Sequence, residues 1–141
     1  MEPEPPIEAL HHIGIAVHSI KEALPRWTDG FGLRLQSFDD VPDEQVRVAV
    51  LMAGSTRIEL IEPMNPESPV AQFLQKRGPG IHHLAFRVAD CQQKLDAMRA
   101  NGAPVLNKVP NRGAHDCKVA FVHPKHLGGV LAELVEDPHH D

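Results

Sequence analysis

Two histidine pairs stand at the start of two similar apolar stretches, LHHIGIAV at residues 10–17 and IHHLAFRV at residues 81–88. Imidazole is the commonest metal ligand in proteins and titrates near neutral pH, so a repeated histidine suggests metal binding or proton transfer. Two carboxylates repeat in the same way, Glu59 within RIELIEP and Glu133 within VLAELVE. A glutamate inside an apolar strand is costly to bury unless it is paired or bound to a metal.

These copies belong to one repeat that runs along most of the chain. His12 and His83 are 71 residues apart, and at the same offset residues 47–51 (RVAVL) match residues 118–122 (KVAFV). With three further residues in the second half, 58–62 (IELIE) matches 132–136 (AELVE). Several matches in one register indicate a tandem duplication of a module of about 70 residues.

Each copy has the same predicted order of elements, a strand, a helix and then three strands. Strands are predicted near 10–17, 32–38, 46–53 and 56–62, and again near 81–88, 104–107, 117–123 and 129–136. Ser19 and Asp90 are predicted to cap the two helices, and Ser68-Pro69 to begin a third helix that links the copies. The prediction is a single α+β domain over 1–141, with module 1 at about 8–64, a linking helix at about 67–78 and module 2 at about 80–137.

Alternation along the strands places the four polar side chains. His12 and His83 point away from the apolar residues that face the helix, and so do Glu59 and Glu133. If the curved sheets of the two modules face each other, the four side chains enclose a shared metal site. Two imidazoles and two carboxylates suit a six-coordinate divalent ion and leave two positions for water or substrate. Alternation does not explain the neighbouring His11 and His82.

Composition excludes several classes of function. The formal charge of −5 and the pI near 6.0 argue against a nucleic-acid partner, which would need a clustered basic face. No apolar run approaches the roughly 20 residues of a membrane helix. Cys91 and Cys117 lie in unrelated contexts, so reduced thiols and a cytoplasmic location are expected. The ends, residues 1–9 and 137–141, are expected to fray.

In its paired modules the chain resembles the vicinal oxygen chelate superfamily. This superfamily includes glyoxalase I, extradiol dioxygenases and fosfomycin-resistance proteins. Within that superfamily it is most similar to the methylmalonyl-CoA epimerases, in LHHIGIAV (10–17), STRIELIEP (55–63), ESPVAQFLQKRGPGIHHLAFRV (67–88) and VAFVHPKHLGGVLAELVE (119–136). By position, the resemblance puts the family's metal ligands on His12, Glu59, His83 and Glu133. It implies Co²⁺ first, with Mn²⁺, Ni²⁺ or Zn²⁺ as alternatives.

The activity implied by the resemblance is metal-dependent epimerisation of (R)- and (S)-methylmalonyl-CoA, an isomerase reaction of propionate metabolism. The α-proton beside the thioester must be removed and returned on the other face, and Glu133 and Glu59 are the candidate catalytic groups. Some members carry a second catalytic glutamate in the third strand, where this chain has Val48. The carrier for the opposite face therefore stays open.

For the CoA portion of the acyl-CoA substrate, the second module offers Lys118, Lys125 and His115 as candidate contacts. The resemblance also implies a homodimer. Two alternatives remain at this stage: a glyoxalase I-like lactoylglutathione lyase, which uses the same proton-transfer logic, and a non-enzymatic small-molecule binding protein of the same fold.

Overall fold

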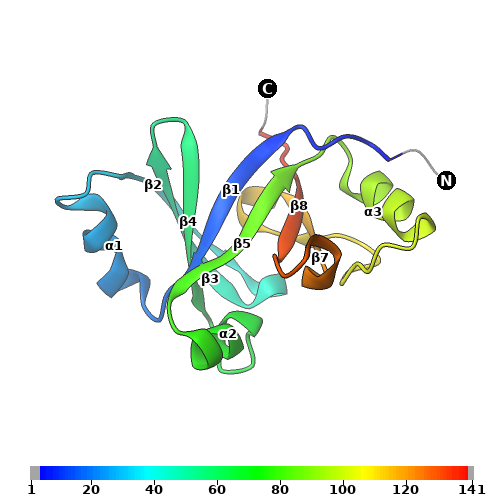
Figure 1. Ribbon diagram of the computed structural model, residues 1–141. Coiled ribbons are helices and arrows are strands. Elements are labelled where there is room, and N and C mark those ends of the chain that lie inside the picture. The colour runs from blue at the N-terminus through cyan, green and yellow to red at the C-terminus, as the bar shows by residue number, and fades with distance from the viewer. Residues whose placement is uncertain (1–3, 140–141) are drawn as a thin grey trace. The chain divides into compact units, whose positions relative to one another are not determined.

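The computed structural model describes residues 4–139 of the chain. Contacts along the chain divide it into two compact units: His12–His82, called the first unit, and Met1–His11 with His83–Asp141, called the second unit. Figure 1 shows the elements in chain order. Strands β1 (Ala9–Ala16) and β5 (Gly80–Arg87) each begin in one unit and continue into the other.

In the first unit, β1 leads into a helix and three further strands. The elements are α1 (Ile20–Thr28), β2 (Arg34–Val41), the 3₁₀ helix η1 (Pro42–Glu44), β3 (Val46–Ala53), β4 (Thr56–Pro63) and the linking helix α2 (Pro69–Arg77). The sheet order is β2-β3-β4-β1, with β1 parallel to β4 and the other pairs antiparallel. The predicted caps are confirmed: the Ser19 hydroxyl accepts from the Glu22 N–H and the Ser68 hydroxyl from the Val70 N–H.

The second unit repeats this order with shorter strands. Its elements are β5, α3 (Cys91–Ala100), β6 (Asn111–Arg112), η2 (Ala114–Asp116), β7 (Lys118–Val122), η3 (Pro124–Leu127) and β8 (Ala132–Glu136). The sheet order is β5-β8-β7-β6, with β5 parallel to β8. The Asp90 carboxylate accepts a hydrogen bond from the Gln93 N–H at 2.9 Å, so this predicted cap is also confirmed.

Strand register is the same in the two units, as the sequence repeat predicts. Gly14 lies opposite Glu59 in the β1–β4 pair, and Ala85 lies opposite Glu133 in the β5–β8 pair. Since Gly14 and Ala85 are 71 residues apart, the register repeats at the offset found in the sequence. The predicted α+β fold, with two copies of the strand-helix-strand-strand-strand order, is confirmed.

A second shared feature fixes the start of each helix to the last strand of its unit. The Ile20 N–H of α1 donates to Oε1 of Glu62 at 2.7 Å, and the Cys91 N–H of α3 donates to Oε1 of Glu136 at 2.9 Å. A carboxylate is favourable at a helix N-terminus because the unpaired N–H groups there carry partial positive charge. Each helix is thereby held over one face of its own sheet.

Each unit has its own apolar core between helix and sheet. In the first unit the buried members are Ile15, Val17, Ile20, Ala49, Leu51 and Leu60, with Leu24 and Trp27 of α1 packed against them. In the second unit they are Val88, Cys91, Leu95, Met98, Ala120, Val122, Ala132 and Leu134. The opposite face of each sheet is left to carry the repeated polar residues.

One predicted strand is wrong. The segment 104–107 forms only an isolated bridge between Val105 and Val122, and the edge strand is the two-residue β6. The segment still docks on β7, because the Leu106 N–H donates to the Phe121 carbonyl and the side chain of Asn107 accepts from the Phe121 N–H. Pro104 and Pro110 cannot donate backbone hydrogen bonds, which prevents a longer ladder here.

The expected fraying of the chain ends is wrong for the parts that the structure describes. Lys94 donates through Nζ to the Pro5 carbonyl at 2.8 Å, and the Glu8 N–H donates to the Arg87 carbonyl at 2.9 Å. Asp137 is held by His11 at the other end of the chain. Residues 1–3 and 140–141, also expected to fray, lie outside the described residues. Within 4–139, no helix has the length and apolar character to cross a membrane.

Candidate active site

In the first unit, His12 of β1 lies beside Glu59 of β4. The two strands are parallel neighbours, and Nδ1 of His12 is 3.3 Å from Oε2 of Glu59. Both residues are buried, with 5% and 6% of their surface exposed. Gly14, next to His12 on the same face, has no side chain and therefore leaves room above Glu59, its cross-strand partner.

In the second unit, His83 of β5 and Glu133 of β8 form the equivalent pair. Nε2 of His83 is 3.3 Å from Oε1 of Glu133, and the two residues are again 5% and 6% exposed. The Phe121 ring packs edge-on against the His83 imidazole, with ring centroids 5.6 Å apart. Phe121 lies directly opposite Glu133 across β7 and β8, so an apolar wall borders this pair.

The chemistry of these pairs fits a divalent metal ion. A buried carboxylate at 3.3 Å from an imidazole offers one oxygen and one nitrogen donor. Oxygen and nitrogen donors of this kind suit Co²⁺, Mn²⁺, Ni²⁺ or Zn²⁺, whereas a structural zinc cage would use sulfur ligands. Each unit by itself therefore carries one imidazole and one carboxylate that suit such an ion.

A carboxylate that sequence reasoning missed lies on the same sheet face as Glu59. Val48 of β3 is buried and has no ionisable group. Asp39 of β2 lies directly opposite Val48, and Val50, two residues along β3, lies opposite Glu59. Directly opposed residues share a face, so Asp39 and Glu59 are on one face of the first unit's sheet. Only the strand register reveals this, because the β-bulge between Leu35 and Ser37 shifts the alternation along β2.

The candidate CoA contacts all lie on the second unit. Lys118 at the start of β7 and Lys125 in η3 are exposed, and His115 in η2 is half-buried. Nζ of Lys118 is 3.9 Å from Oε2 of Glu136, an exposed contact of little energetic weight. The first histidine of each pair has other contacts than the second. The His82 ring packs edge-on against the Phe73 ring, with centroids 5.0 Å apart, and His11 contacts Asp137.

Comparison with known proteins identifies the family of this chain. The profile of the glyoxalase/bleomycin resistance protein/dioxygenase superfamily matches residues 11–121. The ethylmalonyl-CoA/methylmalonyl-CoA epimerase of Cereibacter sphaeroides is 37% identical over 91% of this chain and 97% of its own length.

Solved structures give the same relationship. A methylmalonyl-CoA epimerase from Mycobacterium tuberculosis has a TM-score of 0.89 and 35% identity, and the match covers 97% of this chain and 93% of that one. A methylmalonyl-CoA epimerase in complex with methylmalonyl-CoA and NH₄⁺ has a TM-score of 0.88 and 31% identity, covering 95% and 97% of the two chains. The chain therefore belongs to the glyoxalase/bleomycin resistance protein/dioxygenase superfamily, and within it to the family of the methylmalonyl-CoA epimerases, as its sequence predicts.

Proposed function

We propose that this chain is a methylmalonyl-CoA epimerase, an isomerase that exchanges the α-proton of a 2-carboxyacyl-CoA thioester. The observation that carries the proposal is the buried histidine–glutamate pair, present in both units with the same 3.3 Å separation and the same strand register. A pure binding protein would have no use for two desolvated carboxylates at matched positions, because each is costly to bury. The names of the relatives support the same reaction and substrate.

The proposed metal ligands are His12, Glu59, His83 and Glu133, two from each unit. When bound, a divalent ion would supply Lewis-acid stabilisation of the negative charge that develops as the α-proton leaves. Burial keeps these four side chains from exchanging their partners for water, so the donor atoms are held ready for the ion. Co²⁺ remains the first choice of metal, ahead of Mn²⁺, Ni²⁺ and Zn²⁺.

The chain's own acids and bases have separate parts in the proposal. Glu133 takes the α-proton on one face, because a carboxylate within hydrogen-bond reach of the reacting carbon can act as a general base. The proton returned to the other face comes from the first unit. There we assign Asp39 as the carrier and keep Glu59 as a ligand and alternative carrier, since both lie on one face of the sheet and Val48 cannot serve.

The acyl-CoA portion is proposed to bind on the second unit. Lys118 and Lys125 are exposed cations that can contact phosphate oxygens, and His115 lies in η2, just before the strand that begins with Lys118. The homodimer and the cytoplasmic location stay predictions from the sequence.

The test is deuterium incorporation at the α-carbon of methylmalonyl-CoA in D₂O, followed by proton NMR. The Co²⁺-loaded protein should exchange the α-proton, and the rate should fall to background after chelation and recover when Co²⁺ is restored. The same preparation is assayed with the glutathione hemithioacetal of methylglyoxal. Turnover of the hemithioacetal without α-proton exchange would contradict the proposal and favour a lactoylglutathione lyase.

A further inference from the structure

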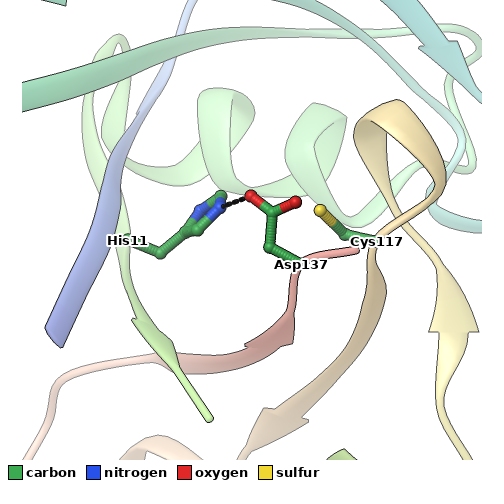
Figure 2. Close-up of side chains that lie close together, drawn as sticks. All are labelled: His11, Cys117 and Asp137. Carbon is green, nitrogen blue, oxygen red and sulfur yellow. Dashed lines mark hydrogen bonds and ion pairs between the residues drawn. The ribbon is translucent and has the colours of Figure 1, made fainter. Parts of the chain in front are cut away.

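Three side chains that can ligate a metal, His11, Cys117 and Asp137, lie close together in the second unit and are largely buried. Nε2 of His11 is 2.7 Å from Oδ2 of Asp137, and these side chains are 7% and 9% exposed. The Sγ atom of Cys117 completes the group: one ligand atom from each residue lies within 4.8 Å of the other two. In Figure 2, His11 and Cys117 point from opposite sides toward the Asp137 carboxylate. We refer to these residues as the His11–Cys117–Asp137 cluster.

Strand register separates this cluster from Glu133. Val119 lies opposite Val135, one step beyond the Phe121–Glu133 pair, so Cys117 and Asp137 continue the same row on the same face. Asp137 is four residues from Glu133, which in extended chain is about 13 Å. The buried Val119 and Val135 fill the space between, at 3% and 1% exposure. One ion therefore cannot bind both Glu133 and Asp137.

The cluster is held in place by backbone contacts on both sides. The Gly113 N–H donates to the Cys117 carbonyl at 2.8 Å, and a side chain at Gly113 would come within 2.6 Å of Val119 Cγ1. On the other side, the His139 N–H donates to Oδ1 of Asp137 at 2.8 Å. Cys117 and Asp137 are therefore positioned by local structure before any ion binds.

We propose that the His11–Cys117–Asp137 cluster is a second metal site, selective for an ion that accepts sulfur, with Zn²⁺ as the best fit. One thiolate, one imidazole and one carboxylate are a mixed donor set that zinc accepts and that the oxygen-preferring Mn²⁺ does not. Tetrahedral zinc would hold the donor atoms roughly 3.3–3.7 Å apart. The His11–Asp137 contact then opens by less than about 1 Å, and a water or the exposed His139 fills the fourth position.

The first unit provides an internal comparison for this proposal. The repeat places His82 at the position of His11, Val46 at that of Cys117 and Pro63 at that of Asp137. Val46 lies directly opposite Pro63, and His82 packs against the Phe73 ring. The scaffold is thus duplicated, but the first unit carries no sulfur or carboxylate ligand at these positions.

The test is titration of metal-free protein with Co²⁺, recorded by near-ultraviolet absorption. Cobalt bound to a thiolate gives an intense charge-transfer band, whereas cobalt bound to histidine and glutamate alone does not. Wild-type protein should develop this band, with the intensity of one thiolate-bound ion per chain, and reach saturation by two equivalents, because the four-ligand site of the proposed function also takes Co²⁺. The band should be absent in Cys117→Ser and weakened in His11→Ala. It does not depend on epimerase activity, so this test and that of the proposed function can fail independently.

Two matched variants complete the experiment. Cys91 is fully buried in the apolar core between α3 and the sheet and does not belong to the cluster. Burial, followed by the Glu136 and Glu133 carboxylates, also raises the pKa of this thiol to about 12. Cys91→Ala should therefore keep the band, and so should His82→Ala. Absence of the band from wild-type protein, or its persistence in Cys117→Ser, would overturn the proposal. Because wild-type and Cys91→Ala already decide the result, a folding defect in one cluster variant does not obscure it.

Discussion

The two units share the same central strands and helix contacts and differ at their edge strands. Both place a histidine 3.3 Å from a glutamate on parallel neighbouring strands, and both fix the helix N-terminus with a second glutamate of the last strand. They differ at the edge strand, which has eight residues in β2 and two in β6. The comparison indicates that duplication kept the histidine–glutamate pairs, the proposed metal ligands, and the glutamates that fix the helices. The edges diverged, giving the first unit Asp39 and the second a loop with exposed lysines.

The largest expected effect on the exchange rate comes from replacing the two equivalent glutamates, Glu133 and Glu59, one at a time. Glu133→Gln removes the proposed base and should slow deuterium incorporation about 10²–10⁴-fold, a range typical of general-base removal. Glu59→Gln should cost less, because an amide oxygen can still bind the ion. Both rates are measured at saturating Co²⁺ so that metal loss does not contribute. Equal losses would mean that the two units contribute alike to proton transfer, against the roles assigned here.

A smaller effect tests the acid that distinguishes the first unit. Asp39→Asn should lower kcat for epimerisation roughly 100-fold, at the low end of general acid–base effects. Asp40→Asn is the matched control, because Asp40 lies on the other face, opposite Arg47 and 3.9 Å from its Nε. If the two variants had the same kcat, Asp39 would not be the second proton carrier.

The glutamates at the helix N-termini should contribute equally to stability. Glu62→Ala and Glu136→Ala each remove a carboxylate acceptor from a helix N–H, which should lower the free energy of unfolding by about 1–2 kcal/mol. Urea unfolding followed by circular dichroism measures both. If only one variant lost stability, the two helix contacts would not be energetically equivalent.

The smallest effect concerns substrate binding by the second unit. Lys118→Ala and Lys125→Ala should each raise KM for methylmalonyl-CoA roughly 3- to 5-fold and change kcat little, because an exposed charge contact contributes about 1 kcal/mol or less. Lys21→Ala, an exposed lysine of α1, controls for the change in net charge. If KM rose as much for Lys21→Ala, the proposal that the second unit binds the CoA portion would be wrong.

Features that follow from the sequence repeat or from local sequence rules were predictable. The caps Ser19, Ser68 and Asp90 and the alternation around His12 and His83 rest on local rules of turns and strands, and the structure bears them out. The same alternation also brought Glu59 and Glu133 to the histidine side of their strands.

Features that depend on irregular backbone or on distant contacts were not predictable. The strand at 104–107 failed because two prolines interrupt an edge that needs backbone donors. Asp39 escaped notice because a bulge changes the alternation of β2. The contact of His11 with Asp137 joins residues at opposite ends of the chain, and no local pattern reports a pair so far apart in sequence.

The most direct test of the shared site is metal stoichiometry in a Cys117→Ser background, which removes the cluster in the second unit. Isothermal titration with Co²⁺ should give one ion per chain, and either His12→Ala or His83→Ala should abolish that binding. This result is expected because the proposed site takes two ligands from each unit. Two ions per chain, with one retained in each single-histidine variant, would mean that each pair binds its own ion and would contradict the account.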